Sequence, residues 1–251
     1  MNRLQAQWQR LFLSSPPSPE DAAPPPLQDA QGRTRALVLE LARPAEWPVL
    51  AAVWQAVQQE LGLPAPTIAV SGGEGFQLWF ALSEPEPPAP GLAFLQALCQ
   101  RYLPDVAPAR LRLQAGSESR TAGECLSDAP PATLPPQPQA RAGQWSAFVS
   151  PDLAPVFADC PWLDVAPNTD GQAELLAGLA CLSPEAMREA TARLAPLHLE
   201  TEIPMSREAA PPGATPPTLT PQAFLSQVMN DASVPLALRI EAAKALLQHG
   251  P

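Results

Sequence analysis

The residues with the clearest chemical potential gather around one glycine-rich turn and the aromatic segment after it. Ser71, Gly72 and Gly73 open the sequence SGGEGFQLWF, in which Gln77 and Trp79 alternate with apolar residues. A strand with this alternation buries one face and presents Gln77 and Trp79 on the other. The glycines and aromatics suit a nucleotide-facing motif, and glycine-rich turns also form wherever a hairpin needs positive φ. Both interpretations stay open at this point.

Three charged residues could complete such a surface. Glu40 stands in the apolar segment Arg35–Leu41, either as a candidate site residue or as a solvated or arginine-paired strand residue. Arg110 and Arg112 alternate onto one face of the segment RLRLQ and are the candidate nucleic-acid contacts. Trp79 could stack on a base or simply pack as a surface cover.

The elements that must position these residues follow the order strand, helix, strand, strand, helix, strand. This order predicts an α+β fold with a ferredoxin-like βαββαβ core and an RRM-like sheet, whose first and third strands are central and whose helices cover one face. Alternation places Leu37, Leu39 and Leu41 with Phe76, Leu78 and Phe80 on the covered face, and leaves Val38, Glu40, Gln77 and Trp79 on an open face. The predicted strands are 35–41, 67–71, 76–82 and 110–114, and the predicted helices are 45–61 and 92–102.

A core of this kind, with an acidic first strand and an SGG turn before an aromatic strand, resembles the archaeo-eukaryotic primase superfamily, which includes bacterial primase-polymerases. The resemblance covers roughly residues 34–115. It implies two acids, one residue apart, on the first strand for divalent metal, and a histidine after the turn for the nucleotide. Here the acids' positions are Glu40 and Ala42, and the histidine's position is Gln77. Two-metal phosphoryl transfer needs several carboxylates, so the site is interpreted as degenerate.

Composition narrows the function classes. The formal charge of −10 disfavours general attraction to nucleic-acid phosphates. Four separated cysteines and two histidines give no zinc pattern, so no metal and no cofactor is expected. No segment has the length or hydropathy of a signal peptide or membrane span, so a cytoplasmic protein without membrane contact is expected.

Proline clusters divide the rest of the chain. Residues 1–32 are predicted to hold an amphipathic helix and a linker, followed by the core at 33–115 and a second linker at 116–142. Residues 143–163 are too apolar for a free tail, and residues 143–195 are expected to be short helical elements packing on the core, with 196–219 disordered. Whether residues 143–195 cover part of the open sheet face stays open at this point. Residues 220–251 are predicted to form a helical hairpin able to dock a partner protein, and they resemble a segment of proteobacterial and phage-packaging-related proteins.

These observations lead to a hypothesis and two alternatives. The leading hypothesis is a non-catalytic, primase-like binding or adaptor protein linked to DNA replication or mobile elements, with weak or no nucleic-acid binding. One alternative is a residual metal-dependent nucleotidyltransferase that combines Glu40 with Glu74 or Glu118. The other is a protein-interaction scaffold that acts through residues 220–251.

Overall fold

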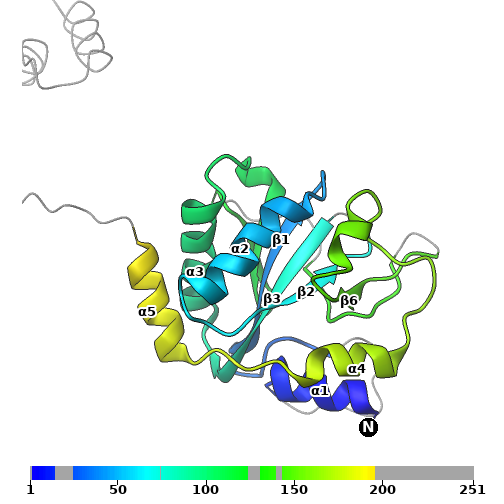
Figure 1. Cartoon of the computed structure of the whole chain (residues 1–251). Helices are drawn as coiled ribbons and strands as arrows, with labels where there is room; N and C mark the ends of the chain where they lie inside the picture. The colour runs from blue at the N-terminus through cyan, green and yellow to red at the C-terminus, as the bar shows by residue number, and fades with distance from the viewer. Residues whose placement is uncertain (1, 15–24, 74, 124–130, 140–142, 196–251) are drawn as a thin grey trace, which may run out of the picture. The chain divides into compact units, whose positions relative to one another are not determined.

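The computed structural model of the chain describes residues 2–14, 25–73, 75–123, 131–139 and 143–195. Within them, six strands form one antiparallel sheet in the order β5-β4-β1-β3-β2-β6, accompanied by five α-helices (Figure 1). The strands are β1 (Thr34–Ala42), β2 (Thr67–Val70), β3 (Gly75–Glu86), β4 (Leu111–Ala115), β5 (Glu118–Thr121) and β6 (Ala147–Val149). The helices are α1 (Arg3–Leu11), α2 (Trp47–Gln59), α3 (Pro88–Tyr102), α4 (Thr169–Ala177) and α5 (Pro184–Leu194), with short 3-10 helices η1 (Pro108–Arg110) and η2 (Ala154–Phe157).

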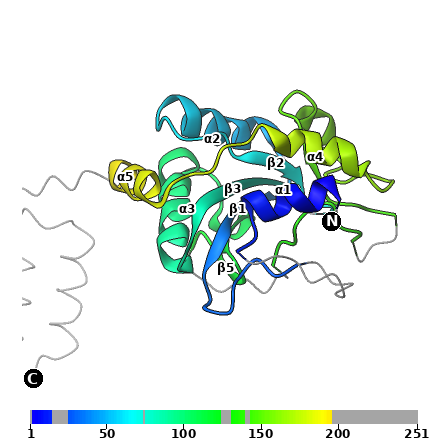
Figure 2. The same ribbon diagram turned by 90° about the horizontal axis from the view of Figure 1, so that it is seen from below.

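One face of the sheet carries the main hydrophobic core, as the alternation predicts. Helices α2 and α3 cover this face, and α5 lies beside α3 (Figures 1 and 2). The α2 sequence suits this position because an apolar stripe runs along one side of the helix, and Gly62, at φ +68°, follows its end. The six core-facing strand residues expected from the sequence are all buried here: Leu37, Leu39, Leu41, Phe76, Leu78 and Phe80.

The opposite face of the sheet carries a second core. Helices α1 and α4 lie side by side over it (Figures 1 and 2), and Phe12, just after α1, is fully buried against Trp79 and Phe148. Leu134, from the segment between β5 and β6, is fully buried in the same cluster. The prediction of an open sheet face is therefore wrong, because the apolar side chains of α1, α4 and β6 shield the alternate strand residues from solvent.

Polar contacts fix α1 over this face. The side chain of Asn2 caps the helix by accepting from Gln5 N at 2.8 Å. The indole of Trp8 donates to Pro135 O at 3.0 Å. Arg10 donates to Leu176 O at 2.7 Å and to Leu179 O, beyond α4, at 2.8 Å. The predicted N-terminal helix is thus part of the folded unit, joined to it by both apolar and polar contacts.

The remaining expected segments differ in outcome. Where the sequence suggests a linker at 116–142, the described residues include β5, which pairs with β4, and the buried Leu134. The expected short elements in 143–195 are present as β6, η2, α4 and α5. The segments 196–219 and 220–251 lie outside the described residues. In the part of the chain that is described, no helix is both long and apolar enough to cross a bilayer.

Candidate functional site

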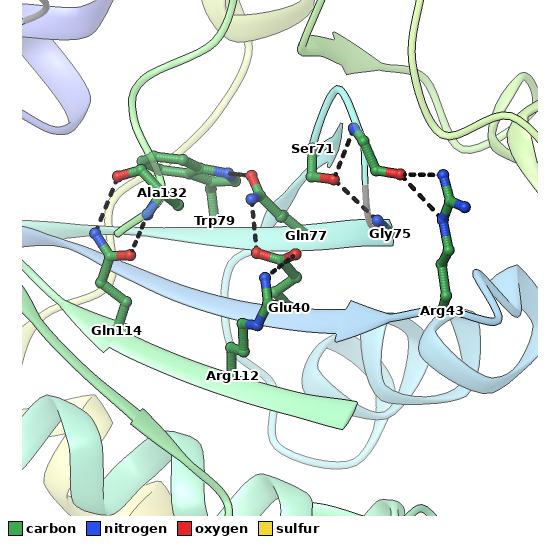
Figure 3. A network of polar contacts seen from close by, with 10 residues as sticks. Glu40, Arg43, Ser71, Gly75, Gln77, Trp79, Arg112, Gln114 and Ala132 are labelled. Atoms are coloured by element: carbon green, nitrogen blue, oxygen red, sulfur yellow. Dashed lines mark hydrogen bonds and ion pairs between the residues drawn. The ribbon is translucent and has the colours of Figure 1, made fainter. Parts of the chain in front are cut away.

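Three adjacent strands place a row of polar side chains across the centre of the sheet. Pairing of β1 with β3 sets Glu40 opposite Gln77, and pairing of β1 with β4 sets Glu40 opposite Arg112. Trp79 lies two residues after Gln77 on β3 and therefore shares its face. The structure brings four of the sequence-predicted site residues together, as Figure 3 shows.

Hydrogen bonds join these four side chains in sequence. The Trp79 indole N–H donates to Gln77 Oε1 at 2.9 Å, and Gln77 Nε2 donates to Glu40 Oε2 at 3.0 Å. Arg112 Nη1 donates to Glu40 Oε1 at 3.3 Å, which completes an ion pair. The Gln77 amide is thus an acceptor from the indole and a donor to the carboxylate, which fixes its orientation.

The side chains of this row are largely buried, unlike those of an exposed binding surface. Glu40 is 6% exposed, Gln77 4% and Trp79 1%, and only the Arg112 side chain, at 25%, reaches solvent substantially. Phe12 meets the Trp79 ring edge-on at 5.5 Å between centroids. Buried polar groups that satisfy one another in this way are typical of a structural polar network. Trp79 packs against Phe12 and Phe148 in the second core, which agrees with the packing interpretation except that the residue is buried and not at the surface, and which leaves no exposed ring face for a base.

The glycine-rich turn is held by its own serine. Ser71 Oγ accepts from Gly73 N at 3.3 Å and from Gly75 N at 2.9 Å, while Gly72 N donates to Pro161 O at 2.9 Å. Gly72 has φ +88°, a conformation that glycine adopts without strain. These backbone N–H groups, which in a phosphate-binding turn would point at the ligand, are engaged within the protein.

The turn is also tied to the end of β1. Arg43 donates from both Nε and Nη2 to Gly73 O, at 3.2 and 2.8 Å (Figure 3), and its guanidinium lies 5.8 Å from the centre of the Trp162 ring. Ser71, Gly72 and Gly73 therefore lie together at one end of the β2–β3 hairpin. They form a hairpin turn that is hydrogen-bonded to Arg43 and to the segment that contains Pro161 and Trp162.

The two arginines proposed as nucleic-acid contacts point to different partners. Arg110 lies in η1, where its Nη2 donates to Pro44 O at 2.7 Å and pairs with Glu46 at 2.8 Å. Arg112 lies on β4 and pairs with Glu40. Each guanidinium already faces a carboxylate, which reduces the positive field that either could offer to a phosphate backbone.

Groups that could hold a metal or act as nucleophiles are dispersed. Among the described residues, no cluster of three His, Cys, Asp or Glu side chains has a metal-binding arrangement. Glu118 lies on β5 and pairs with Arg120 at 3.6 Å, two strands away from Glu40. Glu74 is outside the described residues. Burial raises the pKa of the Cys99 thiol to about 12, so this cysteine stays protonated near neutral pH.

Two further buried glutamines were not identified from the sequence. Gln114 on β4 accepts from Ala132 N at 2.6 Å and donates to Ala132 O at 3.0 Å, so its amide pairs with the backbone as another strand would. Gln172 on α4 pairs in the same way with Phe148 N and O, at 2.7 and 2.9 Å. The latter pair caps the outer side of β6, the last strand of the sheet. A glutamine alternating with leucines in RLRLQ was the available signal for the first, whereas nothing distinguishes Gln172 from an exposed helix residue.

Comparison with known proteins identifies neither a family model that matches this chain nor a curated protein that matches it.

Proposed function

We propose that this protein is a non-catalytic binding or adaptor protein built on a ferredoxin-like, primase-like core. The observation that carries the proposal is the buried polar row of Glu40, Gln77 and Trp79, each engaged by another side chain of the same protein. A nucleotide or primer terminus would need this sheet face to be accessible. In this chain the face is occupied by Phe12, α1 and α4, which favours a role in which the sheet is a scaffold.

The ferredoxin-like part of the proposal is supported by the connectivity of the central elements. β1, α2, β2, β3, α3 and β4 follow one another in the chain, and the four strands lie in the order β4-β1-β3-β2. Both α2 and α3 cover the same face, as the split βαβ arrangement requires. β5 and β6 extend this arrangement by one strand at each edge.

A primer-synthesis assay tests the catalytic side of the proposal. The full-length protein is incubated with unprimed and primed DNA templates, nucleoside triphosphates and Mn²⁺, beside the variants Glu40→Gln and Glu46→Gln. Glu46 is the matched control, because it is also a glutamate paired with an arginine but lies at the start of α2. The expected result is no template-dependent product from any of the three proteins.

One pattern of products would overturn the proposal. In this pattern the wild type and Glu46→Gln incorporate nucleotides and Glu40→Gln does not, while circular dichroism shows that all three proteins remain folded. This pattern would assign Glu40 to a working metal site. Calorimetric titration with Mn²⁺ gives an independent readout, because Glu40-dependent heat would support the same conclusion.

A further inference from the structure

Two large apolar side chains project into solvent from η2. Leu153, which precedes the helix, is 56% exposed, and Val156 within it is 73% exposed. Side chains three residues apart on a 3-10 helix lie above one another, so these two form one apolar ridge. The ridge is held in place from beneath, because Ala154 is fully buried in the main core and η2 packs against α2.

The segment that carries this ridge has one sign of charge. Residues 142–187 contain no lysine, arginine or histidine, whereas they contain six acids, at positions 152, 159, 164, 170, 174 and 185. Asp152 and Asp159 are both exposed and flank η2 directly. Within the described part of the chain, neither of these two carboxylates forms an ion pair. The ridge is therefore bordered on both sides by a carboxylate that forms no ion pair with a described residue, and one of the two, Asp159, shares its surroundings with Arg43.

A hollow of about 380 Å³ adjoins the ridge. Its wall consists mainly of small and ring side chains, and its charged members are Arg43 and Asp159. The guanidinium of Arg43 is directed to Gly73 O and to the Trp162 ring, so Asp159 is the wall group that remains available to an incoming cation. The remaining lining residues are Pro44, Ala45, Ala158 and Pro161.

We propose that η2 and this hollow form the docking surface for a basic amphipathic helix of a partner protein. Large apolar side chains on one face of that helix would cover Leu153 and Val156. Flanking lysines or arginines would pair with Asp152 and Asp159. Nucleic acid and anionic lipid surfaces carry the same sign of charge as this segment, so electrostatics disfavours both. The inference rests on the adaptor role proposed above and specifies the chemistry of the partner.

The test uses a short synthetic helical peptide of leucine, alanine and lysine, with the leucines on one face, as its probe. A matched peptide replaces every lysine by glutamate. Binding to the full-length protein is measured by fluorescence anisotropy, and nitrogen-15 NMR shift changes locate the contact. The lysine peptide is expected to bind at least about tenfold more tightly, with the largest shifts around residues 43–45 and 152–161.

Paired variants decide whether η2 is the contact. Leu153→Ser with Val156→Ser, and separately Asp152→Asn with Asp159→Asn, are each expected to weaken binding about tenfold. The control is Leu175→Ser with Asp170→Asn, which removes an exposed leucine and an exposed acid from α4 and is expected to change affinity by less than about twofold. All these positions are exposed, so thermal unfolding should confirm that each variant stays folded.

Three results would overturn the inference: no binding of the lysine peptide, equal binding of the two peptides, or equal loss in the η2 and α4 variants. None of these bears on primer synthesis, which is measured without any peptide. Failure of the docking surface and failure of the non-catalytic role are therefore distinguishable.

Discussion

Replacement of Phe12 by alanine tests whether the second face of the sheet is an integral core. Phe12 is fully buried, stands edge-on to Trp79 with ring centroids 5.5 Å apart, and stacks on Phe148 at 6.1 Å. Burial of a phenylalanine side chain contributes about 1.5–3 kcal/mol, and each aromatic pair adds about 0.5–1.5 kcal/mol. We therefore expect Phe12→Ala to lower the free energy of unfolding by about 3–5 kcal/mol, the range found for buried aromatic truncations.

The measurement is urea denaturation of the full-length protein, followed by tryptophan fluorescence and circular dichroism. A lower midpoint with an unchanged slope would report lost stability without a change in the surface exposed on unfolding. Leu175→Ala is the control, since this α4 residue is 37% exposed and should cost less than about 1 kcal/mol. A loss below about 1 kcal/mol for Phe12→Ala would refute the reasoning, because the segment after α1 would then be a loosely attached cover.

Three further predictions concern the turn and a buried thiol. A Cβ added to Gly75 would lie 1.8 Å from Leu41 O, whereas nothing lies within 4 Å of a Cβ added to Gly73. Gly75→Ala should therefore lower the free energy of unfolding by about 3 kcal/mol, and Gly73→Ala by less than about 0.5 kcal/mol. Equal urea midpoints for the two variants would contradict the close backbone contact at Gly75. Iodoacetamide at pH 8 should label the exposed Cys160 but not Cys99 in the folded protein, as peptide mass spectrometry would show, and labelling of Cys99 at the same rate would contradict its burial. Burial raises the pKa of the Cys99 thiol from 9.0 to about 12, so the folded state binds the thiol proton more tightly than the unfolded state does. The contribution of this group to the free energy of unfolding is therefore present below pH 9 and is lost as the pH rises towards 12.

The central elements could be predicted because local pattern and global fold agree there. Alternation along Arg35–Leu41 and Phe76–Leu82 identified the residues that α2 and α3 bury, and the glycines between β2 and β3 identified the hairpin. The bounds differ most in β3, which continues through Pro85 to Glu86, whereas the sequence predicts an end at residue 82. Proline is tolerated near the end of this strand, where fewer ladder hydrogen bonds remain to be made.

Coverage of the other sheet face could not be predicted, because alternation shows which side chains share a face but not which other segments pack against that face. Glu40 and Gln77 would alternate in the same way whether they faced solvent or each other. The partners that make their burial favourable come from distant positions: Arg112 lies 72 residues after Glu40, and Phe12 precedes the whole core. Only the three-dimensional arrangement shows that these groups satisfy one another.

The covered face also constrains where a partner can bind. Opening it would expose Trp79 and Phe12 to solvent and would break the contact between their rings, and these changes cost free energy of the order of kcal/mol. A ligand would have to supply that energy before gaining any affinity of its own. Leu153 and Val156 already stand in solvent, so a partner that covers them gains apolar burial without disrupting existing contacts. The energetics therefore favour binding at η2, on the periphery of the fold, over binding at the centre of the sheet.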